Sequence, residues 1–153
     1  MEHRTLQVSF DGFVETIEPG LRRALAGHLP IDEVPDALNE AFTYAWEHWH
    51  DVQQLENPGG YLFRVAQSRL RRRRPGYLAP DDPERPAHVE PGLVPAMRSL
   101  PIQQRSVVWL VHGCGWSYGE VAVALGITAS TVGTHLTRGM ARLRAELGVD
   151  DAR

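Results

Sequence analysis

A cluster of prolines limits how this chain can fold. Six of its eleven prolines, at positions 75, 80, 83, 86, 91 and 95, fall within a short stretch of the 153-residue chain that also carries four acidic side chains. Proline-rich segments are semi-extended at ~3.1 Å per residue, so residues 75–92 can separate two domains by up to roughly 50 Å. We therefore expect a linker at 75–92 between two small domains, 1–74 and 93–153, and each domain can hold a different site.

The first half is patterned as three helices. Ser9 can cap a helix with apolar residues at helical spacing, and Pro19 is expected to kink or interrupt it. A second helix is expected near 34–50, and a third begins at Asn57-Pro58, a capping residue followed by proline at the first helical position. The inner side of the second helix is expected to contain Val34, Leu38, Phe42, Ala45, Trp46 and Trp49.

The second half is also helical in its pattern. A short helix is expected at 94–99, followed after Leu100-Pro101 by a longer one that stops at Gly113. No segment shows strand-like alternation of useful length. The expected fold class is therefore all-α, with two small helical domains.

A helix-turn-helix is the clearest local motif. Ser117 and Glu120 fit a capping box, Gly126 can end that helix, and Thr128 can cap the last one. In such a unit the second helix lies in the major groove, so the residues near its start must be polar, short and outward facing. The side chains that meet this need are Ser130, Thr131, Thr134 and His135, with Arg138 and Arg142 further along for phosphates. An ordinary helical hairpin with a polar face is the alternative.

Charge is unevenly distributed along the chain. The net charge of −3 argues against strong nucleic-acid binding, because Lys and Arg supply most non-specific affinity for phosphates. Residues 1–74 hold nine Arg against eleven acids, residues 75–92 one against four, and residues 93–153 six against four. The C-terminal half and the arginine run at 69–74 are therefore the better candidates for DNA contact.

Specific runs of sequence resemble the sigma-70 family of bacterial transcription initiation factors. The C-terminal half resembles region four through Leu100-Pro101-Ile102-Gln103-Gln104-Arg105, Trp116-Ser117-Tyr118-Gly119-Glu120-Val121-Ala122 and Ser130-Thr131-Val132. The N-terminal half resembles region two through Asp36-Ala37-Leu38-Asn39-Glu40-Ala41-Phe42, Trp46 and Asn57-Pro58-Gly59-Gly60-Tyr61-Leu62-Phe63-Arg64-Val65-Ala66. The order and the short linker are similar to the extracytoplasmic-function group, and the likeness covers about 9–74 and 93–147.

This resemblance implies partners and contact residues. The acidic face of the second helix is implied to bind core RNA polymerase through Asp36, Asn39, Glu40 and Glu47. The third helix and the loop before it are implied to open and read the minus-ten promoter element through Tyr61, Arg64, Ser68 and Arg69, with Arg71, Arg72, Arg73 and Arg74 on phosphates. The helix-turn-helix is implied to read the minus-thirty-five element, and an anti-sigma factor is a further possible partner.

Four positions depart from the family pattern. Gly59 and Gly60 replace a bulkier, often basic pair, Gly133 replaces a basic residue, and His135 stands where Arg is common. A glycine inside a helix costs ~1 kcal/mol against alanine, and a missing cation removes one phosphate contact. These departures leave two alternatives open: a sigma-like DNA-binding regulator that does not recruit polymerase, and a decoy that binds an anti-sigma partner.

Other functions have little support in the sequence. His48 and His50 are two residues apart and do not share a helical face, so they do not indicate a metal site. A single cysteine, Cys114, excludes an intrachain disulfide and a cysteine-based zinc cluster. No nucleophile elbow, phosphate-binding loop or carboxylate pair supports an enzyme, and we expect no cofactor. Without a membrane span or a signal segment, the chain is expected to stay in the cytoplasm.

Overall fold

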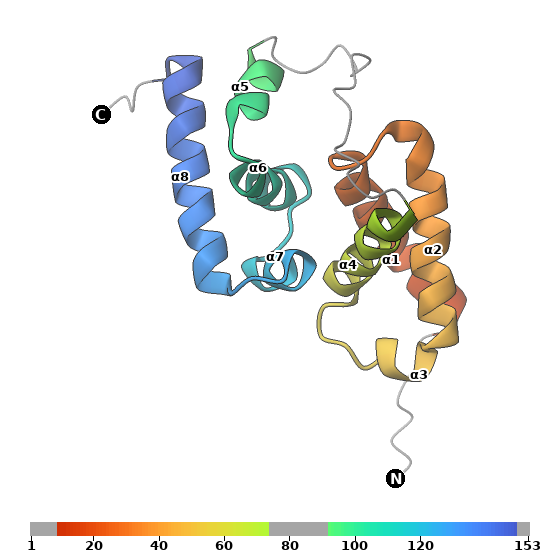
Figure 1. Cartoon of the computed structure of the whole chain (residues 1–153). Helices are drawn as coiled ribbons and strands as arrows, with labels where there is room; N and C mark the ends of the chain where they lie inside the picture. Colours follow the sequence, from red (N-terminus) through yellow and green to blue (C-terminus); the bar gives the residue numbers. More distant parts are fainter. Residues whose placement is uncertain (1–8, 74–91, 150–153) are drawn as a thin grey trace.

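The structure, a computed structural model, describes residues 9–73 and 92–149; for residues 71–73 it describes the backbone alone. These residues form helices and turns without any strand, in two groups that lie side by side (Figure 1). The expected all-α fold class is confirmed. The expected linker lies outside the described residues except for Gly92, so its boundaries stay a prediction.

The N-terminal group contains α1 (Phe10–Ala26), a 3₁₀ turn (Ile31–Glu33), α2 (Val34–Glu47), the short α3 (Trp49–Val52) and α4 (Pro58–Arg73). Ser9 caps α1 as predicted, because its Oγ accepts a hydrogen bond from the Gly12 amide at 3.2 Å. The predicted interruption at Pro19 is wrong, since α1 runs through it unbroken. Pro19 is exposed, whereas the opposite side of α1, with Leu21 and Leu25, is buried and holds the helix in place.

The N-terminal core forms where α1 and α2 pack on α4. Small residues on α2 allow this close packing, and Leu62 and Phe63 of α4 are fully buried beneath it. The core position predicted for Trp46 is wrong, because this side chain is 65% exposed. Ala37, Ala41 and Ala45 are the buried small residues of α2, and Trp46 lies at the edge of the packed face with its ring edge-on to Phe10 of α1, at 5.0 Å between ring centres. Trp49 is half-buried, after a break in the helix at His48.

The C-terminal group contains α5 (Leu93–Ser99), α6 (Ile102–Val108), a π-helical turn (Trp109–Gly113), α7 (Tyr118–Leu125) and α8 (Ala129–Leu147). The predicted helix ending at Gly113 is confirmed, with its last turn widened into the π form. The long α8 covers α5, α6 and α7, and its buried residues are Val132, Leu136, Gly139 and Leu143. Gly139 allows the closest approach, because a Cβ there would lie 2.9 Å from Val108.

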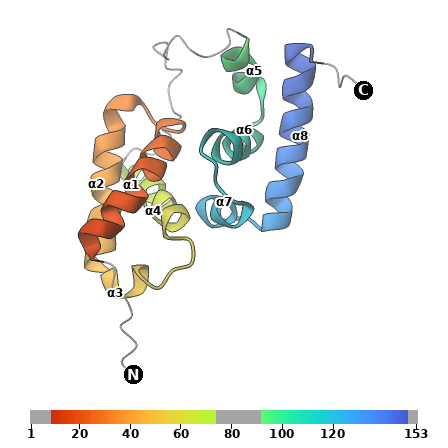
Figure 2. The same ribbon diagram turned by 180° about the vertical axis from the view of Figure 1, so that it is seen from behind.

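The two groups pack against each other, chiefly along α4 and α7 (Figures 1 and 2). Two glycines of the N-terminal half lie at the points of closest approach. A Cβ on Gly60 would lie 2.5 Å from the backbone oxygen of Glu120, and a Cβ on Gly27 would collide with the indole of Trp109. Any side chain at either position would push the halves apart.

Candidate nucleic-acid interface

The helix-turn-helix forms with the caps that the sequence predicts. The Oγ atom of Ser117 accepts from the Glu120 amide at 3.2 Å, and the Glu120 carboxylate accepts from the Ser117 amide at 2.7 Å. Gly126 then ends α7 in the left-handed region with φ 67°, and Thr128 caps α8 by accepting from the Thr131 amide at 3.1 Å. Each cap is worth ~1 kcal/mol, so the turn between the helices is well defined.

A hollow lies on the outer face of α8, where α7 approaches it. Its volume is about 430 Å³, and its lining residues are Tyr118, Ser130, Gly133, Thr134, Thr137 and Arg138. Three of the six predicted contacts on α8 line it: Ser130, Thr134 and Arg138. The sequence prediction missed Tyr118 and Thr137. The position of Tyr118 directly after Ser117, the capping residue of α7, could have indicated it. In the structure Tyr118 lies beside Gly133.

The other three predicted contacts on α8 do not line this hollow. Thr131 is half-buried, and its hydroxyl is hydrogen-bonded to the hydroxyl of the capping residue Thr128 at 2.8 Å. His135 is half-buried, and its Nδ1 atom is buried without a hydrogen-bond partner among the described residues. Arg142 is exposed. The predicted DNA contacts on α8 therefore fall into two groups: three line the hollow, and Thr131, His135 and Arg142 lie outside it.

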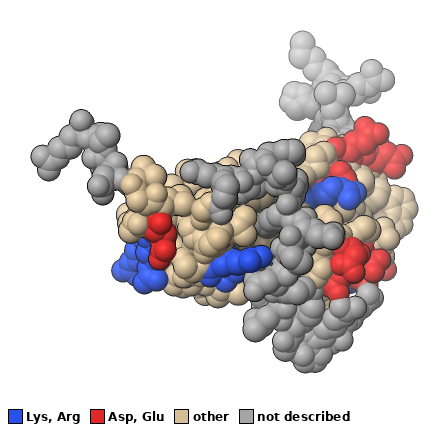
Figure 3. Space-filling view, turned by 90° about the horizontal axis from the view of Figure 1, so that it is seen from above, with Lys and Arg blue, Asp and Glu red and all other residues tan. Residues whose placement is uncertain are grey.

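Three of the four predicted polymerase-binding residues lie on the outer side of α2. Asp36, Asn39 and Glu47 are exposed, and the exposed Trp46 lies beside them. In the view from above, acidic side chains gather over the N-terminal half, whereas the end of the molecule formed by α8 carries a group of arginines beside an acidic group (Figure 3). On this face acidic side chains predominate on the N-terminal half, which also carries a basic patch, whereas the α8 end carries both signs of charge.

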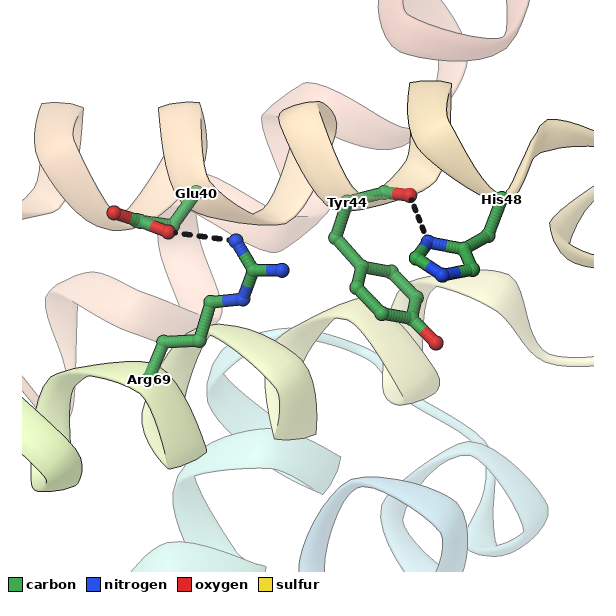
Figure 4. Close-up of polar contacts among 4 residues, drawn as sticks. All are labelled: Glu40, Tyr44, His48 and Arg69. Carbon is green, nitrogen blue, oxygen red and sulfur yellow. Dashed lines mark hydrogen bonds and ion pairs between the residues drawn. The ribbon is translucent and has the colours of Figure 1, made fainter.

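Two residues predicted to bind different partners bind each other. Glu40 on α2 forms an ion pair with Arg69 on α4, with a distance of 2.9 Å between Oε2 and Nη1 (Figure 4). Both side chains are largely covered, at 16% and 33% exposure. The Arg69 guanidinium also lies 5.4 Å from the ring centre of Tyr44. Glu40 is thus less available to a partner than Asp36 or Glu47.

A second cavity lies between α2, α3 and the start of α4. Its volume is about 130 Å³, and its lining residues are Tyr44, His48, Asp51, Val52, Leu55 and Tyr61. The Tyr44 and His48 rings stack with centres 4.1 Å apart, and His48 donates from Nδ1 to the Tyr44 carbonyl at 3.0 Å (Figure 4). The sequence prediction named only Tyr61 of this set. Tyr44 and His48 lie one helical turn apart, a spacing that could have revealed their stacking.

The hydroxyl groups of Tyr44 and Tyr61 are hydrogen-bonded to each other at 2.9 Å. This hydrogen bond raises the pKa of the Tyr44 hydroxyl above its usual value, and desolvation adds to the effect. Tyr44 is therefore neutral at physiological pH, and its ring offers a stacking surface without a charge.

The remaining predicted minus-ten contacts lie further along α4. Ser68 is exposed, and Arg64 is exposed but lies close to the C-terminal end of α7. A Cβ on Gly126 would be 3.5 Å from the Arg64 guanidinium carbon. The side chains of Arg71 and Arg72, and residue Arg74, lie outside the described residues.

A half-buried histidine joins the two halves. His28 hydrogen-bonds through Nδ1 to the Ala24 carbonyl at 2.9 Å and through Nε2 to Ser106 Oγ at 3.1 Å. Since a carbonyl only accepts, Nδ1 carries the proton and Nε2 accepts from the serine. Burial lowers the pKa of His28; the hydrogen bond to Ala24 opposes this shift and the charge of Arg105 adds to it. The ring also packs edge-on against Phe63, which in turn contacts Trp116.

Neither a metal site nor a reactive thiol is found in the part of the chain that the structure describes. No three His, Cys, Asp or Glu side chains there are grouped closely enough to hold a metal ion. Burial raises the pKa of the Cys114 thiol to about 11, so it remains protonated. No helix within 9–73 or 92–149 is long and apolar enough to cross a membrane.

Comparison with known proteins identifies the family. Residues 93–143 match the family described as "Sigma-70, region 4". The RNA polymerase sigma-E factor of Streptomyces antibioticus is 32% identical to this chain over 94% of the chain and 87% of that protein, and that of Streptomyces coelicolor is 30% identical over 94% and 89%. The chain is a sigma factor of the sigma-70 family. It matches these relatives through both halves, with the region order of the extracytoplasmic-function group.

Solved structures of sigma factors have the same fold. The sigma factor RpoE of Bartonella quintana, in complex with the anti-sigma factor NepR, superposes with a TM-score of 0.70 over 92% of this chain and 98% of that chain, at 22% identity. CnrH, in complex with the cytosolic domain of CnrY, superposes with a TM-score of 0.64 over 93% and 89%, at 25% identity. Each superposition includes both halves of this sigma factor.

The structure gives physical reasons for two departures from the family pattern. Gly60 is required for the close approach of α4 to the backbone of α7, and Gly133 leaves open the floor of the hollow beside Tyr118. Gly59 has no such role, because a Cβ there would meet nothing within 4 Å.

Proposed function

We propose that this sigma factor binds core RNA polymerase through α2 and directs it to promoters with two DNA-reading surfaces, one in each half. The observation that carries this proposal is the helix-turn-helix, in which α8 starts at a capped turn and presents exposed polar residues and Arg138. Such a helix fits the major groove of DNA. The factor is proposed to have no catalysis of its own, since RNA synthesis belongs to the polymerase.

The N-terminal half is proposed to read the minus-ten element. An unstacked base needs an aromatic surface and a pocket, and stacking on a side chain is worth ~1–3 kcal/mol per base. The cavity beside Tyr44, His48 and Tyr61 offers both, Arg64, Ser68 and Arg69 lie on the same helix, and the arginine run continues along the sequence to residue 74. Arg69 would keep its ion pair with Glu40 while its neighbours contact phosphates.

The two halves are proposed to act as separate domains on a promoter. The minus-ten and minus-thirty-five elements are about 25 base pairs apart, or about 85 Å at ~3.4 Å per base pair. Halves in contact along α4 and α7 cannot reach both elements at once. Eighteen residues, 74–91, connect the described parts and span at most about 60 Å when fully extended. The helical groups cover the rest of the distance, since α4 and α8 are themselves about 24 and 28 Å long at ~1.5 Å per residue.

Protein partners follow from the same surfaces. Exposed Asp36 and Glu47 beside Trp46 are proposed to bind basic residues of polymerase, where complementary charge sets orientation and association rate. An anti-sigma factor is a further proposed partner, because a sigma factor of the same fold is held by NepR.

In vitro transcription with core polymerase and a genomic promoter library tests the proposal. The factor should direct initiation at a defined set of promoters, and Arg138→Ala should reduce all of them. The double variant Asp36→Arg, Glu47→Arg should lose core binding while remaining folded. This pair is preferable to one that includes Glu40, since reversal at Glu40 would also repel Arg69. The exposed control Glu15→Arg should bind core polymerase as the parent does.

A stand-alone DNA-binding regulator is the second candidate, favoured by Gly133 in place of a cation on α8. It predicts DNA binding without co-purification of polymerase. A salt titration separates the two. With two or three phosphate contacts from the arginines of α8, binding by the free chain should be modest, with a slope of about −0.9 per contact. Polymerase should tighten binding by roughly 10²–10⁴ by tethering both domains.

A further inference from the structure

The lining of the hollow on α8 combines apolar groups of Gly133 and Tyr118 with polar side chains such as Ser130 and Arg138. Gly133 forms its floor without a side chain, and the ring edge of Tyr118 forms one wall, 3.5 Å from where a Cβ on residue 133 would lie. Thr134 and Thr137 form the opposite side. The size and shape of this hollow thus depend on the combination of Gly133 and Tyr118.

The two threonines offer methyl groups rather than hydrogen-bond donors. Thr134 donates its hydroxyl hydrogen to the Ser130 carbonyl at 3.2 Å, and Thr137 donates to the Gly133 carbonyl at 3.0 Å. In this arrangement both hydroxyl hydrogens point to the helix backbone, and the threonine methyl groups are left for a ligand to contact. Together with the Tyr118 ring edge they form the apolar part of the hollow, beside Ser130 and Arg138.

Among the groups that DNA exposes in the major groove, only the thymine 5-methyl is apolar; the others are hydrogen-bond donors and acceptors. Given the proposed placement of α8 in the major groove, on which this inference rests, we propose that the hollow receives the 5-methyl group of one thymine in the minus-thirty-five element. Gly133 and Tyr118 are then specificity-determining residues for that position. Arg138, at the edge of the hollow, is placed to hold an adjacent phosphate or guanine.

Replacing each thymine of the minus-thirty-five element by deoxyuridine, one at a time, tests this directly, with the full chain bound to core polymerase. Deoxyuridine differs only in lacking the 5-methyl, whose burial is worth about a fourfold change in affinity. One position should show this loss. At that position cytosine should bind weakly, and 5-methylcytosine should restore part of the affinity because its methyl occupies the same place in the groove.

Protein variants link the effect to the hollow. Gly133→Leu should abolish the preference for thymine over deoxyuridine, because its side chain fills the hollow. Ala145→Leu, an exposed position on the same helix outside the hollow, is the matched control and should keep it. Thr134→Ser, which removes the methyl, should lower the preference more than Thr134→Val, which removes the hydroxyl.

The outcomes separate this inference from the proposed function. Equal binding of thymine and deoxyuridine at every position, or a preference that Gly133→Leu leaves intact, overturns the inference while sequence-specific binding still supports the function. If the sequence preference at the minus-thirty-five element stays the same in every variant of α8, the proposed function itself is overturned.

Discussion

The two proposed DNA-reading surfaces differ in how far they are already engaged within the molecule. The C-terminal surface on α8 faces outward, with Thr134 and Arg138 exposed around an open hollow. In the N-terminal half Arg69 is paired with Glu40, Tyr61 with Tyr44, and Arg64 lies beside the end of α7. The comparison indicates that the C-terminal surface is open as it stands, whereas in the N-terminal surface Arg69 and Tyr61 are engaged within their own half and only Arg64 lies at the contact with α7.

The largest effect is expected at the contact between the halves. Gly60→Val should separate them, because its Cβ would lie 2.5 Å from the backbone oxygen of Glu120, and backbone cannot move aside as a flexible side chain does. Overpacking of this kind costs ~1–3 kcal/mol. Small-angle X-ray scattering should show a larger radius of gyration. Gly59→Val carries the same helix penalty but meets nothing within 4 Å, so it should remain compact. Equal compactness of both variants would contradict the packing described.

A smaller effect is expected on the open surface. Thr134→Ala should cost about 1 kcal/mol in binding to the preferred promoter, the order of one buried methyl contact, and relax preference at one position. Arg138→Ala should weaken all sequences alike and reduce the salt slope by about 0.9, if its main contact is a phosphate. Selection of preferred sites with each variant, together with salt titrations, measures both. Preferences that match the parent in both variants would remove α8 from base recognition.

The ion pair between Glu40 and Arg69 should contribute less, and its contribution is to the stability of the N-terminal half. A double-mutant cycle on Glu40→Gln and Arg69→Gln should give a coupling of about 0.5–1 kcal/mol in the free energy of unfolding, because the Arg69 side chain keeps 33% of its surface exposed to solvent. The exposed Glu47→Gln combined with Arg69→Gln provides the control and should give no coupling. If the first cycle also shows none, Arg69 is free for DNA even in the isolated chain.

The smallest effect is a dependence of the closed arrangement on pH. His28 is neutral when buried between the halves, and its pKa is lowered there. A separated or unfolded chain with an ordinary pKa of about 6.5 therefore binds more protons, so stability is complete above about pH 6.5 and falls as the pH decreases below it. His28→Gln should reduce this dependence in denaturant titrations, whereas the exposed His50→Gln should not. If His28→Gln leaves the pH dependence of stability unchanged, groups other than His28 cause that dependence.

Local patterns predicted most of the helices and the helix-turn-helix. The caps at Ser9, Ser117 and Thr128 and the helix end at Gly126 depend on residues within a few positions of one another, so sequence spacing reveals them. Helical periodicity predicted that Trp46 is buried in the core, but this side chain is exposed. The buried side of α2 consists largely of alanines, and periodicity alone does not show that small residues are favoured there.

Contacts between distant segments could not be predicted. Glu40 and Arg69 each fit a surface role by themselves, and only the packing of α2 on α4 joins them. Gly60 was noted as a departure from the family pattern, but its reason, the backbone of α7, lies about 60 residues further along the chain. The same applies to Tyr118 and Gly133, whose shared hollow depends on the angle between two helices.

The distance between the halves tests the central claim most directly. Labels on exposed positions of α2 and α8, such as Thr43 and Ala145, allow this distance to be measured in the free chain and in the polymerase complex on a promoter. A single distance, set by the packed halves, is predicted for the free chain, and on the promoter an increase of several tens of Å, toward the spacing of about 85 Å between the two elements. The same distance in both states, with promoter-specific initiation intact, would contradict the account of two separable DNA-reading domains.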